Sequence, residues 1–219
     1  MNTLTKLALG LMGQIKPRPA SGESAPRWTL PVPAQRGGMP LMEALRRRQS
    51  QREFAADALS EQQLSDLLWA AGGVNRRDLG GRTAPSAMNA QEIRIYAALP
   101  QGLFRYEPIA HELERIRAED VRAVTGYQDF VDSAALDLVY VADHARMKLV
   151  PAAQREAYAY AAAGATVQNV YLYCASANLA TVVRAWFDRK ALADAMGLGN
   201  DEQLLLTQTV GVPKAGSGH

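Results

Sequence analysis

The sequence predicts an α+β fold, and three observations lead to this prediction. Apolar residues recur at helical spacing in several segments. In other segments they alternate or run continuously, as they do in strands. The two kinds of segment follow one another without the regular strand–helix–strand repeat of a parallel sheet. With 219 residues, 48% of them hydrophobic, the chain is long enough to bury a core.

The first 39 residues are predicted to be an arm or linker, and residues 40–219 the folded domain. The segment 17–40 is rich in Pro, Gly and Ser, which favour extended chain and turns. Trp28, Leu30 and Val32 alternate within it, so part of the arm is expected to lie on the protein surface or on a partner subunit. The opening residues form a poor secretory signal because their apolar stretch is short. A cytoplasmic protein is therefore expected, with export as the alternative.

Two helices are predicted in the first half of the domain. A short one begins at Pro40, a residue that suits the first turn of a helix, and runs out near three consecutive arginines. A second follows Ser60 and Gln63, whose spacing is typical of a capping box, and ends at Gly72 and Gly73.

Strands are predicted at four places. Residues 91–99 alternate and indicate a half-buried strand, which turns at Pro100–Gly102 and pairs with 103–106. Residues 135–143 are more continuously apolar and suit the middle of a sheet. Residues 204–212 form the last strand.

Two further helices are predicted in the second half. Residues 154–180 are rich in Ala and carry apolar residues at helical spacing. Residues 189–196 form a shorter helix that Gly197 ends.

Composition excludes several classes of protein. A formal net charge of +2 does not indicate a general nucleic-acid binder. A single cysteine, Cys174, allows no internal disulfide, and three scattered histidines give no metal-ligand spacing. No apolar run reaches the roughly 20 residues of a membrane span. Phosphate-binding glycine loops and the motifs of hydrolases are also absent from the sequence.

The segment RRRQSQREF, residues 46–54, is the first candidate binding site. In an extended chain Arg48, Ser50 and Arg52 point to the same side. Guanidinium forks and a hydroxyl group suit a phosphate. The alternative is a solvated helix end, whose arginines complement the helix dipole.

Two other segments carry polar groups among apolar surroundings. Pro85, Ser86 and Asn89 lie in a loop before a strand and offer amide and hydroxyl groups. Ala185 and Trp186 follow a short apolar run and could place backbone amides beside a bound ring. Taken by itself, the segment with Pro85, Ser86 and Asn89 is simply a turn, and Trp186 could equally belong to the core.

In this order, the segments resemble the nitroreductase superfamily of flavoproteins, and more closely its SagB-type branch. RQSQREF matches the opening pattern R-R-S-x-R-x-F except at Gln49. Asn178 and Ala180 stand where the family usually has glycine, and Trp186 where it has a small residue. The resemblance covers about residues 40–213. Further matching blocks are residues 59–76, 82–96, 102–116, 128–143 and 167–198.

The resemblance implies an FMN-binding fold with a mostly antiparallel central sheet flanked by helices. It also implies an intertwined homodimer with the flavin at the subunit interface. By position, the FMN phosphate would be held by Arg48, Ser50 and Arg52, with a polar contact from Gln49 and a late cation from Lys214. Pro85, Ser86 and Asn89 would lie along the isoalloxazine, and the backbone at Ala185 and Trp186 would face flavin N5.

The implied activity is that of an FMN-dependent oxidoreductase. Hydride would pass from NAD(P)H through FMN to a quinone, a nitroaromatic compound or a similar acceptor, and no side chain would act as a nucleophile. One alternative is a SagB-type dehydrogenase that oxidises its substrate without nicotinamide. The pairing of Lys and Tyr associated with azoline oxidation does not occur in the chain. A non-catalytic flavin-binding protein is the other alternative.

Overall fold

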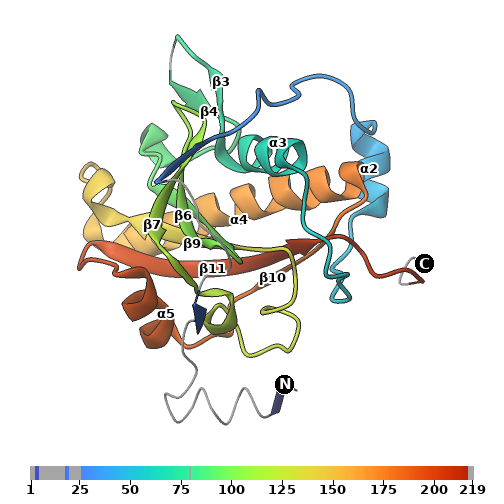
Figure 1. Ribbon diagram of the computed structural model, residues 1–219. Helices are drawn as coiled ribbons and strands as arrows, with labels where there is room; N and C mark the ends of the chain where they lie inside the picture. Colours follow the sequence, from blue (N-terminus) through green and yellow to red (C-terminus); the bar gives the residue numbers. More distant parts are fainter. Residues whose placement is uncertain (1–2, 5–17, 20–25, 79, 217–219) are drawn as a thin grey trace.

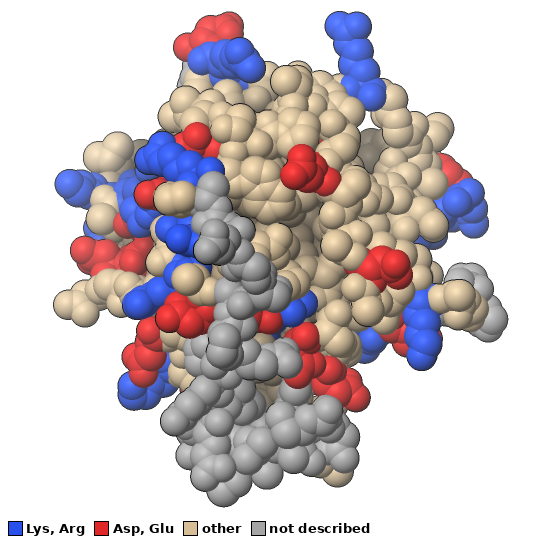
Figure 2. Space-filling view, viewed as in Figure 1, with Lys and Arg blue, Asp and Glu red and all other residues tan. Residues whose placement is uncertain are grey.

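The computed structural model describes residues 3–4, 18–19, 26–78 and 80–216 (Figure 1). The interpretation of the opening residues as a poor secretory signal therefore falls largely outside the described residues. Within the described part of the chain, no helix is long and apolar enough to cross a membrane. On the face that Figure 2 shows, charged side chains of both signs are interspersed.

A seven-stranded sheet in the order β10-β11-β9-β5-β6-β7-β2 forms the centre of the molecule. Each neighbouring pair in it is antiparallel, and helices cover it, so the predicted α+β class is confirmed. The predicted hairpin is β5–β6, and the apolar strand β9 lies in the middle of the sheet, as expected. The strands are β2 (Arg27–Thr29), β5 (Ile93–Leu99), β6 (Gly102–Glu107), β7 (Glu112–Arg117), β9 (Leu136–Asp143), β10 (Ala180–Arg184) and β11 (Glu202–Gly211).

Two short antiparallel strand pairs lie outside this sheet. β1 (Arg18–Pro19) pairs with β8 (Glu119–Asp120), and β3 (Val74–Arg76) pairs with β4 (Gly81–Arg82). The chain also forms short 3-10 helices at Ala87–Asn89, Arg122–Val124 and His144–Arg146.

The helices lie on both faces of the central sheet. α3 (Glu61–Gly72) and the long α4 (Ala152–Ala177) cover one face, and α5 (Arg189–Met196) covers the other (Figure 1). α2 (Leu41–Arg47) packs on α4. α3 begins with the predicted capping box between Ser60 and Gln63. α5 ends at Gly197 in the left-handed conformation, as predicted. α4 begins two residues before and ends three residues before the predicted bounds.

The core consists of two apolar clusters, one on each side of the sheet. Ile93 and Ile95 of β5 belong to the cluster under α3 and α4, whereas Tyr96 and Ala98 belong to the cluster under α5. β5 is therefore buried on both faces, and the prediction of a half-buried strand was wrong. The reason is that α5, from the far end of the sequence, covers the face that carries Tyr96.

The C-terminal part of the arm packs on the domain. β2 pairs with β7, and Leu30 is buried. Ser65 of α3 donates a hydrogen bond to the carbonyl of Pro31 (2.6 Å), and its hydroxyl oxygen lies 2.7 Å from Nε2 of His111. Since Ser65 already donates, it accepts from His111 Nε2–H, and His111 Nδ1 accepts from the hydroxyl of Tyr106 (2.9 Å). Burial lowers the pKa of His111, which agrees with this neutral form.

Candidate functional site

The basic segment leaves α2 and runs in extended form across the ends of two strands. Gln51 donates its backbone N–H to Thr181 of β10, and Ala55 donates to Val212 just after β11. The backbone N–H of Lys214 donates to Glu53 (3.2 Å). These bonds hold the segment beside β10 and bring the predicted late cation near it.

The arginines of this segment divide into two groups. Arg46 and Arg47 form ion pairs with Glu43 on α2 and lower the pKa of that carboxyl group to about 2. Arg48 and Arg52 pair with no carboxylate of the described residues. The solvated helix end expected as the alternative therefore applies to Arg46 and Arg47 and leaves Arg48 and Arg52 available for a ligand.

Tyr171 of α4 brings Arg48 and Ser50 together. The Arg48 guanidinium lies 5.5 Å from the centre of the Tyr171 ring, and Ser50 Oγ lies 2.8 Å from the Tyr171 hydroxyl. That hydroxyl also accepts the backbone N–H of Val183 (3.0 Å), so its own hydrogen can go to Ser50. Arg48 and Ser50 thus share a side, as their alternation predicts. The Ser50 hydroxyl hydrogen can then be donated to a ligand.

Arg52 and Lys214 lie farther along the segment. They line one open depression of about 460 Å³, together with Phe54 and Phe130. The acidic residues Glu53 and Asp129 line it as well. Arg48 and Ser50 do not, so a role for all four residues at one phosphate stays a prediction.

The loop of residues 85–89 has an unusual backbone. Met88, Asn89 and Gln91 have φ values of 54°, 53° and 52°, a region that residues other than glycine seldom adopt. The loop is held by Ser86 Oγ, which accepts the backbone N–H of Gln91, and by Gln91 Nε2, which donates to Asn89 Oδ1 (3.1 Å). Strained backbone of this kind often marks a binding site.

This loop faces α4 far from Tyr171. Pro85 and Ser86 lie across a hollow of about 190 Å³ from Tyr158 and Ala161. Tyr158 and Tyr171 are thirteen residues apart on α4, which corresponds to roughly 20 Å along the helix axis. A single chain therefore does not bring the loop and the basic segment together.

Ala185 and Trp186 directly follow β10. Both are exposed, and Trp186 keeps 53% of its surface accessible while its ring packs on Tyr127 with centroids 5.2 Å apart. The alternative that Trp186 belongs to the core is therefore wrong. Val183, which bonds to Tyr171, is only two residues away, or roughly 7 Å along the strand. The basic segment and the end of β10 thus lie close together.

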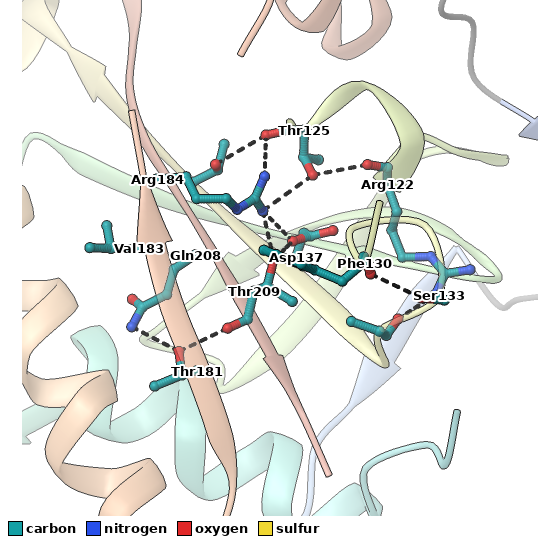
Figure 3. Close-up of polar contacts among 12 residues, drawn as sticks. Arg122, Thr125, Phe130, Ser133, Asp137, Thr181, Val183, Arg184, Gln208 and Thr209 are labelled. Carbon is teal, nitrogen blue, oxygen red and sulfur yellow. Dashed lines mark hydrogen bonds and ion pairs between the residues drawn. The ribbon is translucent and has the colours of Figure 1, made fainter. Parts of the chain in front are cut away.

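A buried ion pair fixes the end of β10 (Figure 3). Arg184 pairs with Asp137 of β9, and both side chains are almost fully buried. Arg184 also donates to the carbonyl of Thr125 (2.8 Å), and Thr209 of β11 donates to Asp137. Burial raises the pKa of Asp137, and the positive charge of Arg184 opposes this shift. The pair ties β9, β10 and β11 together immediately before Ala185.

Sequence reasoning missed Tyr171, Asp137 and the partners of Arg184. Tyr171 looked like a core residue of the helical stripe, but its ring lies under Arg48 and its hydroxyl bonds to Ser50. Asp137 did leave a signal, since it is a charged residue inside the apolar strand 135–143 and must find a buried partner. Among the described residues, no cluster of three potential metal ligands occurs.

Comparisons with known proteins show the family of this chain. The model of the Nitroreductase family matches residues 45–212. A nitroreductase candidate from Methanocaldococcus jannaschii is 31% identical over 161 residues, which cover 68% of this chain and 81% of the relative.

Solved structures extend the comparison. The crystal structure of a nitroreductase candidate from Ralstonia eutropha superposes with a TM-score of 0.87 and 54% identity, covering 91% of this chain and 95% of that one. A candidate from Desulfovibrio desulfuricans, solved in complex with FMN, shares the fold with a TM-score of 0.58 and 23% identity. That comparison covers 84% of this chain and 91% of the other.

Proposed function

This chain belongs to the nitroreductase family, and from that premise we propose that it is an FMN-dependent oxidoreductase. In this proposal hydride passes from NAD(P)H through FMN to a quinone, a nitroaromatic compound or a similar small acceptor. The FMN seen in the Desulfovibrio relative and the chemistry of the basic segment support the choice of cofactor.

The observation that carries the proposal is the meeting of Arg48 and Ser50 at Tyr171. A phosphate monoester needs cationic and hydroxyl donors that no protein acceptor already occupies. Arg48 pairs with no carboxylate of the described residues, and Ser50 can donate its hydroxyl hydrogen. These donors fit the phosphate of FMN.

The rest of the site would orient the ring. When bound, FMN supplies the hydride-accepting chemistry, and the chain provides binding, orientation and a shaped pocket. The exposed backbone at Ala185 can offer an amide to the ring, and the Arg184–Asp137 pair holds this backbone in place. Trp186 on Tyr127 would limit the space for an acceptor.

We include a homodimer in the proposal because one chain separates the loop 85–89 from the basic segment. A second protomer could bring its own loop to Arg48 and Ser50. Apolar side chains on the surface also favour association: Met42 of α2 is 75% exposed, and Leu41 of α2, Met88 of the loop and Tyr158 of α4 are exposed as well.

An absorbance spectrum of the purified protein, before and after anaerobic addition of NADPH, tests this function. Flavin bands that bleach with NADPH are the expected result. Bands that persist would favour the alternative dehydrogenase, which oxidises its substrate without nicotinamide. A colourless protein that takes up no added FMN would contradict the assignment of Arg48, Ser50 and Arg52.

A further inference from the structure

A cavity of about 710 Å³ lies between the C-terminal part of the arm, α3, the β3–β4 pair and the turn between β6 and β7. We call it the arm cavity. Its apolar wall includes Leu30 and Val32 of the arm, Trp69 of α3 and Ile109 of the turn, and Arg77 and Arg82 contribute the positive charge. None of the residues assigned above to the flavin lines it. Its volume is that of a typical small-molecule site.

The mouth of the arm cavity is apolar and accessible. Val32 is 85% exposed and Ile109 is 91% exposed, and both belong to the wall. On the face viewed in Figure 2, the surface over the arm and α3 is mostly uncharged. An occupant with an apolar body would remove these side chains from water, which is favourable in proportion to the apolar area covered.

Arg82 places an uncompensated donor in the wall. Its Nε atom is buried and has no hydrogen-bond partner, and no carboxylate of the described residues forms an ion pair with its guanidinium. A buried donor without a partner costs free energy, and a buried cation costs more. An anionic group in the cavity beside the guanidinium would offset the cost of the buried cation.

The surroundings of Arg82 do not supply this anion. Glu107 and Glu92 are the carboxylates close enough to act on Arg82, but Glu107 pairs with Arg105 (2.7 Å) and both carboxyl oxygens of Glu92 are buried without partners. Burial raises the pKa of Glu92, which weakens it further as a counter-ion. Burial lowers the pKa of Arg82, and repulsion from the nearby Arg146 lowers it further.

We propose that the arm cavity binds a small molecule with an apolar, ring-sized body and one anionic group. Arg82 pairs with the anion, Trp69 and Leu30 contact the body, and Val32 and Ile109 cover it at the mouth. This site is separate from the proposed flavin site and does not depend on the flavin. Arg82 also borders a small hollow beside Pro85 and Ser86.

Titration calorimetry with the full chain tests this inference, first without FMN and then with FMN bound. The probes are 1-naphthoate and its neutral counterpart 1-naphthamide, which have similar shapes and differ in charge. We expect naphthoate to bind about tenfold or more tightly than naphthamide, because a charge-assisted hydrogen bond contributes at least this much. Added FMN should not displace naphthoate.

Two variants and a matched control make the test specific. Arg82→Met should abolish the preference for naphthoate. Arg36→Met removes the same charge from an exposed part of the arm that does not line the cavity, and it should leave the preference unchanged. Ala110→Phe narrows the cavity without touching Arg82 and should weaken both probes, so the test remains decisive even if Arg82→Met does not fold.

Three results would overturn the inference. Equal affinity for the two probes would show that no cation acts in the cavity. An unchanged preference in Arg82→Met would assign the anion to another residue. Displacement of naphthoate by FMN would mean that the flavin itself occupies this place.

Discussion

Arg47 and Arg48 stand next to each other in the chain and have different surroundings. Arg47 is exposed and bound to Glu43 on its own helix, whereas Arg48 lies on the Tyr171 ring without a carboxylate partner in the described part of the chain. The difference arises because α2 ends at Arg47 and the chain then turns toward α4. Arg48 is therefore the stronger candidate for contact with a phosphate.

We predict that Arg48→Met weakens FMN binding by about tenfold to a hundredfold, the loss expected for one hydrogen bond to a charged group. Arg47→Met is the matched control and should bind FMN as the unmodified protein does. Quenching of FMN fluorescence during titration measures both. Equal losses in the two variants would point to a general effect of positive charge.

Trp186 provides a second prediction at this scale. Because its ring is half exposed and packs mainly on Tyr127, Trp186→Ala should change the free energy of unfolding by less than about 1 kcal/mol. It should also lower KM for a bulky nitroaromatic acceptor more than for a small one. Urea unfolding and steady-state kinetics give the two readouts. A large loss of stability would mean that Trp186 is chiefly structural.

Asn178 shows how a departure from the family pattern fits the backbone. It ends α4 in the left-handed conformation with φ of 54°, at a position where the resemblance implies glycine. Asparagine tolerates this conformation better than most residues, so the substitution keeps the helix end.

The alternation of Arg48 and Ser50 could be predicted from the sequence. The hydroxyl of Tyr171 that joins them was not, because helical periodicity marks only which residues face the core.

At the scale of elements, strongly patterned segments were predictable and charged ones were not. The capping box of α3 and the apolar run of β9 each leave a local signal. β7 does not, since most residues of its sequence ELERIR are charged, and it is held partly by the ion pair of Glu114 with Arg105 on β6 (2.7 Å). Such pairs between strands depend on which strands are neighbours, and a single sequence does not show this.

The attachment of the arm to α3 and the β6–β7 turn should depend on pH. His111 is neutral in the folded chain and its pKa lies below the ordinary value of 6.5. As the pH falls below about 6.5, the unfolded chain takes up a proton that the folded chain resists, so the free energy of unfolding decreases. The stabilisation that neutral His111 provides is complete above about pH 6.5, and it is lost as the pH falls to the lowered pKa of the folded chain.

Urea unfolding at pH 7.5 and pH 5.5 measures this effect. The unmodified protein should lose more stability between the two than His111→Asn, a substitution chosen because asparagine tolerates the positive φ of 54° at this position. His144→Asn, in the 3-10 helix at His144–Arg146, is the control and should lose as much stability between the two pH values as the unmodified protein. An identical decline in His111→Asn would remove His111 as its source.

At the scale of the whole molecule, the separation of the loop 85–89 from the basic segment governs how a site can form. The sequence gives the order of these two segments along the chain but not the distance between them in space. That distance follows from the length of α4 between Tyr158 and Tyr171. The shared site was therefore expected from resemblance alone, and the distance along α4 now gives it a physical reason.

Two inactive chains should restore each other if the site is shared. One carries Arg48→Met with Ser50→Ala, and the other carries Ala87→Trp, which fills the hollow between the loop and α4. Neither should bind FMN alone. Coexpressed, they should bind FMN at about a quarter of all sites, as expected for random pairing in a two-fold dimer. A mixture that binds none would place each site within one chain.

The ends of the sheet have a consequence for solubility. β2 is a three-residue strand that covers the outer side of β7, and the basic segment covers β10 through Gln51. Unpaired edge strands invite pairing with other chains, and short or covered edges prevent it. The arm and the segment that carries Arg48 thus also protect the two edges of the sheet from pairing with other chains. A chain shortened to begin at residue 40 would expose the hydrogen-bonding groups of β7, and aggregation through that edge would be its first defect.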